Sequence, residues 1–176
     1  MTAARKVSDS ETLMTHRALP EDANPAGNVH GGVILKHIDL AGAVCAMRHA
    51  RMSVVTASID RMEFKAPVHV GELMLLYASV NRVGKQSMEI GVRVVVENLM
   101  TGEQRHAASA YLTFVSMGPD RKPVPVPELL LETPAQHRRN REAQRRREQR
   151  RDERKREKAA QEALATATVE EVAHYY

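Results

Sequence analysis

Three consecutive stretches that are predicted to be β-strands, separated by very short turns, constrain the fold more than any other feature of this sequence. They cover residues 73–83, 86–98 and 104–116. The last two alternate apolar and polar residues, which is typical of strands that bury one face. Gly84-Lys85 and Thr101-Gly102 mark the turns between them, and connections this short join antiparallel neighbours. The sequence therefore predicts an antiparallel sheet.

Two more strands and one helix are predicted before these three strands. Residues 11–19 alternate loosely, and residues 54–64 contain several large apolar side chains. Between them, residues 33–50 repeat apolar side chains at helical spacing, beginning with Ile34 and Ile38. The predicted class is α+β, with the order strand, helix, then four strands in an antiparallel meander.

The two ends of the chain differ in composition from this central part. Residues 1–10 are polar, and we expect a disordered N terminus there. Five prolines between residues 118 and 134 indicate an extended linker. Residues 135–176 form a charged tail, whose composition favours helix but which has no apolar stripe. The predicted domain therefore spans residues 11–117.

The net charge of +4 hides an asymmetry along the chain. Residues 137–158 hold twelve Lys or Arg and five Asp or Glu, a sum of +7, which leaves −3 for the rest. The basic character therefore belongs to the tail. No aromatic residue lies among the arginines, so nucleic acid is not an expected partner. We expect a solvated helix with charge pairs; binding to RNA or lipid headgroups, or docking on another protomer, are the alternatives.

Composition also bears on the compartment of the protein. No apolar run approaches the roughly 20 residues that span a bilayer, and the first ten residues lack the apolar segment of a secretory signal. Cys45 is the only cysteine, which excludes an intrachain disulfide and a cysteine-based metal site. These features predict a cytoplasmic protein without a membrane span.

A glycine-rich loop, residues 24–32, leads directly into the predicted helix. A helix N terminus presents unpaired N–H groups and a partial positive charge. Gly31 and Gly32 let a substrate approach that backbone closely. Such a site holds a phosphate or stabilises the oxyanion that develops on an attacked carbonyl. The spacing matches neither a P-loop nor a dinucleotide fingerprint, and a simple tight turn is the alternative.

Asp39 stands in the helix where an apolar residue is expected. It lies between Ile38 and Leu40, at the border of the predicted buried face. A partly desolvated carboxylate there suits a general base or a nucleophile. The alternative is an ordinary surface aspartate that pairs with Lys36 or His37.

Several motifs together resemble the signature of the hotdog-fold acyl-CoA hydrolases. They follow one another in the family's order: Asn24-x-x-Gly27-Asn28-x-x-Gly31-Gly32, Leu35-x-x-Ile38-Asp39-x-Ala41-Gly42, Ser58 to Phe64 with Pro67, Val70-Gly71-Glu72, and Val83 to Met88. The resemblance runs from about residue 11 to about residue 117 and excludes the basic tail.

This resemblance implies the fold and the assembly. The expected fold is a hotdog, in which an antiparallel sheet of about five strands wraps around one central helix, followed here by the basic, helical C-terminal tail. Family members pair edge to edge into dimers, and three dimers often form a hexamer. The active site lies at the dimer interface, so a chain with one such domain is expected to form a homo-oligomer.

The resemblance also implies roles for individual residues. Asp39 is expected to act as base or nucleophile, and Asn24 of the other protomer to orient the water or the carbonyl. The backbone N–H groups of Gly31 and Gly32 would polarise the thioester oxygen. Cations and a hydroxyl near strand ends suit the phosphates of CoA; the candidates are Arg61, Lys65, Arg82, Lys85 and Ser87.

The predicted function is an acyl-CoA thioesterase of fatty acid metabolism that releases a free carboxylic acid and CoA. No metal or cofactor is expected, because CoA is part of the substrate and of the product. The alternative is a non-catalytic acyl-CoA-binding sensor or scaffold with a nucleic-acid-binding basic tail. A dehydratase of the same fold would usually need an Asp-then-His motif, which the sequence lacks.

Overall fold

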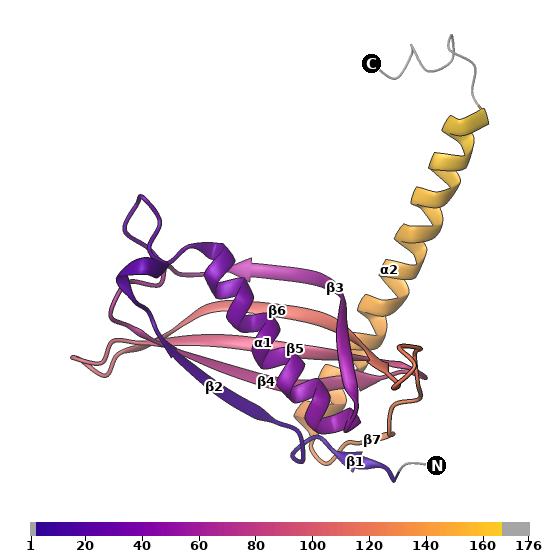
Figure 1. Cartoon of the computed structure of the whole chain (residues 1–176), viewed down its shortest axis with the longest axis horizontal. Coiled ribbons are helices and arrows are strands. Elements are labelled where there is room, and N and C mark those ends of the chain that lie inside the picture. Colours follow the sequence, from indigo (N-terminus) through magenta and orange to yellow (C-terminus); the bar gives the residue numbers. More distant parts are fainter. Residues whose placement is uncertain (1–2, 167–176) are drawn as a thin grey trace. The chain divides into compact units, whose positions relative to one another are not determined.

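The computed structural model describes residues 3–166 of the chain (Figure 1). The chain divides into two compact units, Met1–Arg139 and Asn140–Tyr176. The first unit contains the sheet and the helix α1 (Gly31–Ala50), together with two two-residue strands, β1 (Arg5–Lys6) and β7 (Leu129–Leu130). The candidate site belongs to this first unit.

One five-stranded antiparallel sheet forms the body of the first unit. Its strands are β2 (Thr12–Arg17), β3 (Ser53–Phe64), β4 (Leu73–Val83), β5 (Ser87–Glu97) and β6 (Gln104–Met117). Their order in the sheet is β2-β4-β5-β6-β3. The meander predicted from the short turns is confirmed for β4, β5 and β6. It is wrong for β3, which pairs with β6 at the far edge, because β2 already occupies the free side of β4.

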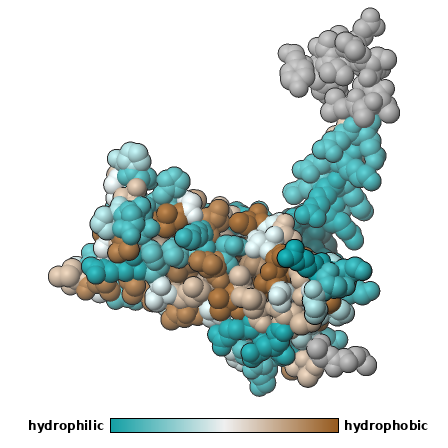
Figure 2. Space-filling view, viewed as in Figure 1, coloured by the Kyte–Doolittle hydropathy of each residue, from teal (hydrophilic) through white to brown (hydrophobic). Residues whose placement is uncertain are grey.

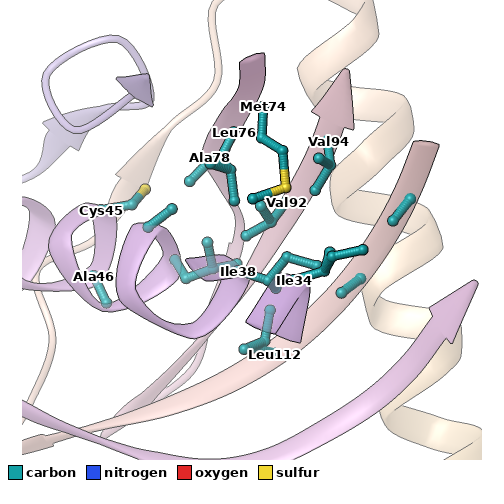
Figure 3. Close-up of a cluster of buried hydrophobic side chains, with 14 of the residues drawn as sticks. Ile34, Ile38, Cys45, Ala46, Met74, Leu76, Ala78, Val92, Val94 and Leu112 are labelled. Carbon is teal, nitrogen blue, oxygen red and sulfur yellow. The ribbon is translucent and has the colours of Figure 1, made fainter. Parts of the chain in front are cut away.

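Helix α1 lies against one face of this sheet (Figure 1). The side chains predicted to be buried at helical spacing, including Ile34 and Ile38, are buried. They pack against apolar side chains from the strands, among them Val92 and Leu112 (Figure 3). Gly42 allows the close approach, since a Cβ there would lie 3.0 Å from the ring of Phe114. The predicted hotdog fold is therefore confirmed.

The N-terminal segment is ordered, so the expectation of a disordered stretch over residues 1–10 is wrong for residues 5–10. Strand β1 pairs in parallel with β7, and Val7 is completely buried. The guanidinium of Arg5 donates to the carbonyl of His49 at the end of α1. These contacts join residues far apart in the sequence, and a single apolar side chain gives no periodicity that could reveal them.

The proline-rich segment 118–134 is part of the first unit and not an extended linker. Val126 is buried in the core, and its N–H donates to the carbonyl of Lys85 at 3.1 Å. The buried imidazole of His49 hydrogen-bonds the carbonyl of Pro127 through Nε2 at 3.0 Å. The boundary between the units therefore falls after Arg139, whereas the predicted boundary was at residue 134.

Helix α2 (Pro134–Thr166) confirms the helix predicted from the composition of the tail. Within it, Gln144 donates to Glu148 and Lys158 lies 3.6 Å from Glu162. Residues 167–176, also assigned to the tail, lie outside the described part of the chain. Over residues 3–166, neither helix combines the length and the apolar composition of a membrane span, and no three His, Cys, Asp or Glu side chains are grouped so that they could hold a metal ion.

Candidate active site

The loop before α1 is a short, tightly bonded hairpin. At its base the N–H of His30 donates to the carbonyl of Asp22 at 2.8 Å, and above it the N–H of Asn24 donates to the carbonyl of Asn28 at 2.7 Å. Gly27 turns the chain with φ of 82°, a conformation that favours glycine. The hairpin therefore holds Asn24 in a fixed place beside the start of the helix.

Asn24 uses its side-chain oxygen to shape this hairpin. Its Oδ1 accepts from the N–H of Ala26 at 2.9 Å and from the N–H of Asn28 at 3.3 Å. Asparagine favours such turns because its side chain can bond backbone a few residues ahead. With the oxygen so engaged, the NH₂ group is the part of this amide that can contact a substrate.

The N terminus of α1 lies directly after this hairpin and is capped by His30. The N–H of Gly32 donates to Nδ1 of His30 at 3.0 Å. One of the two predicted oxyanion donors is thus bonded within the chain, and it becomes available only when the exposed imidazole of His30 turns away. The ring of Phe64 covers Gly31, where a Cβ would lie 3.1 Å from Cζ. Neither contact was predicted from the sequence.

The half-buried carboxylate of Asp39 faces strand β3. Thr56 Oγ1 donates to Asp39 Oδ1 at 2.7 Å. Lys36 and His37 were the alternative partners predicted for Asp39. Of these, His37 makes another contact, because its ring stacks on that of His16. Thr56 was missed by the sequence analysis, because a threonine on a strand is common and carries no motif of its own.

The structure places the proposed catalytic residues in two separate groups within one protomer. Asn24 and the glycines lie together at the start of α1. Asp39 lies eight residues after Gly31 in the same helix, which corresponds to about 12 Å along the axis. Thr56 belongs to the second group, with Asp39.

The five predicted CoA-binding residues also form two groups. Arg61 and Lys65 both pair with Glu63, whose pKa is lowered first by its hydrogen bond with Lys65 and then by the charge of Arg61. Arg82, Lys85 and Ser87 lie at the turn between β4 and β5. The two groups are distant in the sheet, since Arg61 is opposite Tyr111 and Ser87 is opposite Val115 on the intervening strand β6.

Known proteins match this chain in sequence as well as in fold. A family model described as the thioesterase superfamily matches residues 26–103. An acyl-CoA thioester hydrolase of Bacillus subtilis is 40% identical over 129 residues, which are 73% of this chain and 75% of that protein. The chain belongs to the acyl-CoA thioester hydrolase family.

Solved structures of acyl-CoA thioester hydrolases have the same architecture. The acyl-CoA hydrolase of Staphylococcus aureus, characterised in complex with butyryl-CoA, CoA and CoA disulfide, has a TM-score of 0.84 at 31% identity, covering 93% of this chain and 99% of that one. An apo-hexameric acyl-CoA thioesterase has a TM-score of 0.83 at 38% identity, covering 86% and 97%. Further structures of the S. aureus enzyme carry single alanine replacements of an asparagine, an aspartate and a threonine.

Proposed function

We propose that this acyl-CoA hydrolase cleaves its substrate at a site shared by two protomers. Family membership makes the chain an acyl-CoA thioesterase; the proposal concerns the residues that do the chemistry. One protomer supplies the carboxylate of Asp39, held by Thr56. Its partner supplies Asn24 and the backbone N–H group of Gly31, joined by that of Gly32 once the imidazole of His30 turns away.

The position of Asp39 within α1 is the observation that carries this proposal. About 12 Å of helix separates Asp39 from Gly31. A carboxylate that attacks a thioester, or activates water against it, and the N–H groups that bind its oxygen must all lie within about 3 Å of the reacting atoms or of that water. One thioester cannot reach both groups of the same protomer, so a second copy has to complete the site.

The spacing of the replaced residues in the S. aureus hydrolase supports the choice of residues. Its asparagine, aspartate and threonine stand 15 and 17 positions apart. Asn24, Asp39 and Thr56 have the same two spacings in this chain. The match includes Thr56, which enters the proposal independently through its hydrogen bond with Asp39.

The exposed edge of the sheet at β3 is the surface proposed for pairing. Several of its apolar side chains are exposed, among them Val55 and Ile59. Apolar residues also gather on the face that carries α1 (Figure 2), and Leu40 and Met47 of that helix are exposed. Contact between two copies along β3 would cover these side chains. We propose this dimer as the unit of a homo-oligomer, a trimer of dimers in the hexameric form.

The chemistry follows from the second oxygen of Asp39. Thr56 binds Oδ1, which orients the carboxylate and leaves Oδ2 to work as a base or as a nucleophile. As a base, Oδ2 takes a proton from water, whose oxygen bonds to the carbonyl carbon; the C–S bond then breaks and the CoA thiolate recovers a proton. N–H groups at the helix N terminus would bind the oxyanion of the intermediate. The reaction consumes only acyl-CoA and water, so its balance requires no redox cofactor.

The two groups of proposed CoA-binding residues differ in how well they suit phosphate binding. Lys85 is exposed and lies with Arg82 and Ser87 around one turn, which suits a cluster of phosphates. Arg61 and Lys65 already share Glu63. We therefore propose the turn at Lys85 as the main phosphate contact, with Arg61 and Lys65 as auxiliary contacts from another protomer. A cytoplasmic location stays a prediction from the sequence.

Replacement of Asp39 tests the catalytic part of the proposal. We expect Asp39→Asn to lower kcat for saturated acyl-CoA esters from acetyl to palmitoyl by at least about 100-fold, because a positioned base or nucleophile contributes about 10²–10⁴-fold. The matched control is Asp60→Asn, which makes the same change to a carboxylate on β3 bonded by Ser58. Unchanged turnover in Asp39→Asn would show that the assigned role is wrong.

The alternative function, a non-catalytic sensor, predicts a different result. A sensor would bind a non-hydrolysable acyl-CoA thioether without turning over any ester of the series. It would also bind nucleic acid through the basic tail with a strong dependence on salt concentration. Turnover by the wild-type protein that depends on Asp39 rejects this alternative.

A further inference from the structure

Asp22 connects several parts of the proposed site. It is the last residue of the short helix η1 (Pro20–Asp22) and lies two positions before Asn24. Its side chain is only 13% exposed. Oδ2 accepts from the N–H of Leu19 at 2.9 Å and contacts Nε2 of His16 at 2.8 Å. A carboxylate can only accept there, so the His16 ring must donate from Nε2.

The backbone of Asp22 forms the base of the active-site hairpin. Its carbonyl accepts from the N–H of His30 at 2.8 Å, and His30 in turn caps α1 through Gly32. Asp22 is therefore linked to the two features that the partner protomer is proposed to provide: to Asn24 through the adjoining chain, and to the helix N terminus through the backbone of His30. A shift of Asp22 would move both together.

His16 anchors this arrangement to the rigid part of the fold. It lies on β2, opposite Met74 of β4. Its ring stacks on that of His37 of α1, with centroids 3.9 Å apart and planes inclined by 26°. The Asp22 carboxylate is thus tied through one imidazole to the sheet and to the central helix.

The charge state of the pair is consistent with this anchoring. The pKa of Asp22 is lowered, first by the N–H of Leu19 and then by the hydrogen bond with His16. The pKa of His37 is lowered, mainly by burial and then by the charge of His16. The stack is therefore expected to contain a neutral His37 while Asp22 is ionised, and an ionised acceptor makes the stronger hydrogen bond.

We infer that Asp22, held by His16, is a positioning residue that sets Asn24 and the N terminus of α1 in register for the thioester in the shared site. The inference rests on the proposed function, because it concerns the same reaction. Asp22 does not touch the substrate; it acts through the hairpin. Its loss should therefore slow the chemical step more than it weakens the binding of CoA, whose proposed contacts lie on the sheet.

Asp22→Asn tests the inference with little change in volume. We expect kcat to fall about 10- to 100-fold, the size of effect that a misplacement of about 1 Å produces, with KM within about 3-fold of wild type. His16→Gln should lower kcat in the same direction. The double variant should be slower by less than the product of the two single effects, because the two changes share the His16–Asp22 contact and residues in one network are not additive. Glu21→Gln removes the same charge from the adjacent exposed position and should leave kcat unchanged.

The readouts separate positioning from mere stability. The kinetics are measured on the full chain with the acyl-CoA series, and the melting temperature and oligomer mass are measured on the same samples. The inference is overturned if Asp22→Asn keeps wild-type kcat, if it changes KM alone, if Glu21→Gln slows turnover equally, or if lost activity only follows lost folded protein. A wild-type protein that hydrolyses no ester overturns the proposed function and this inference with it, whereas wild-type turnover with an unaffected Asp22→Asn overturns the inference alone.

Discussion

The two edges of the sheet are built differently. Strand β2 has six residues, all of which pair with β4 without irregularity. Strand β3 has twelve residues and pairs with β6 through two register shifts. Directly after β2, the N–H of Ala18 donates to the carbonyl of Glu72, and the N–H of Gly71 donates to the carbonyl of Ala18. The β2 edge is therefore short and continues directly into internal contacts.

The β3 edge has the opposite character. Val55, Ile59 and Phe64 are 48%, 41% and 56% exposed. A long edge strand with exposed apolar side chains is a template for another chain, and proteins normally shorten, charge or cover such edges. The same strand carries Thr56, the partner of Asp39. The contrast supports the proposal that a second copy covers β3 and that catalysis depends on that cover.

Adding a charge to β3 is expected to have the largest effect on oligomer formation and turnover. We expect Ile59→Lys to dissociate the protein into monomers, since a lysine on an edge strand opposes pairing and a two-fold interface repeats each change on both copies. Turnover should fall by at least about 100-fold, because neither protomer retains a complete set of catalytic groups. Light scattering after size-exclusion chromatography and the acyl-CoA assay measure the two effects.

The control for this change lies on the other edge. Leu13 of β2 is 54% exposed, so Leu13→Lys adds the same charge at a similar apolar position. We expect it to remain at least dimeric and active within about 2-fold, since surface substitutions away from such features usually have small effects. Equal dissociation by both variants, or an active dimer of Ile59→Lys, would remove the distinction between the edges.

Thr56→Val, also on β3, is expected to have an intermediate effect on turnover. It removes the hydrogen bond to Asp39 and keeps the shape of the side chain. A hydrogen bond to a charged group contributes about 1.5–3 kcal/mol, so we expect kcat to fall about 10- to 100-fold with little change in KM. Thr56→Ser, which keeps the hydroxyl, should recover most of the activity.

Thr15 provides the matched control on β2. It is exposed, and Thr15→Val makes the same chemical change on the opposite edge. Steady-state kinetics of both variants at one pH provide the comparison. A normal kcat in Thr56→Val would mean that Asp39 does not need this bond; a slow Thr15→Val would mean that the effect is not specific to β3.

Local patterns in the sequence predicted the elements well, and distant contacts poorly. The alternation over residues 86–98 predicted β5 to within one residue at each end, because period-two burial is a local property. It did not reveal that β3 lies beside β6, since alternation reports which face is buried and not which strand is the neighbour. Val7 was missed for the same reason: its burial depends on contacts far along the chain.

The site shows the same limit. Asp39 could be singled out because a carboxylate at the border of an apolar helix face is unusual, and the glycines because they precede a helix. The sequence did not show that Gly32 is bonded to His30, nor that Thr56 bonds Asp39. Both bonds depend on side-chain geometry between segments. The assigned roles of Asn24 and Asp39 stay predictions until the variants are measured.

The smallest expected effect concerns Glu72, whose carbonyl accepts from the N–H of Ala18 just after β2 and whose side chain pairs with Arg105 of β6. Arg105 donates to both oxygens of Glu72, at 2.7 and 2.6 Å, and the N–H of His69 donates to Oε2 at 2.8 Å. The two side chains of the pair are 10% and 27% exposed. The pKa of Glu72 is lowered, first by the hydrogen bond with Arg105 and further by the N–H of His69.

The sign of the pH dependence follows from this direction. A carboxyl group whose pKa is lower in the folded state stabilises the fold above its unfolded value, 4.5 for Glu72, and the stabilisation is lost as the pH falls through the lowered value. We expect Glu72→Gln to reduce the free energy of unfolding by about 1–3 kcal/mol at pH 7. The difference from wild type should shrink as the pH falls below 4.5 and through the lowered pKa of Glu72, where the carboxylate of the folded wild-type protein also becomes protonated.

Urea unfolding at a fixed protein concentration, repeated from pH 7 to pH 3, measures this difference. Glu63 on β3 gives the comparison, because its pKa is also lowered by hydrogen bonds and nearby charges, but it lies in the open. Solvent screens exposed ion pairs, so Glu63→Gln should cost less stability at pH 7 than Glu72→Gln. If the two variants lose equal stability, or if the loss in Glu72→Gln is the same at pH 3 as at pH 7, the ionised Glu72–Arg105 pair is not what stabilises the turn that bonds Ala18 after β2.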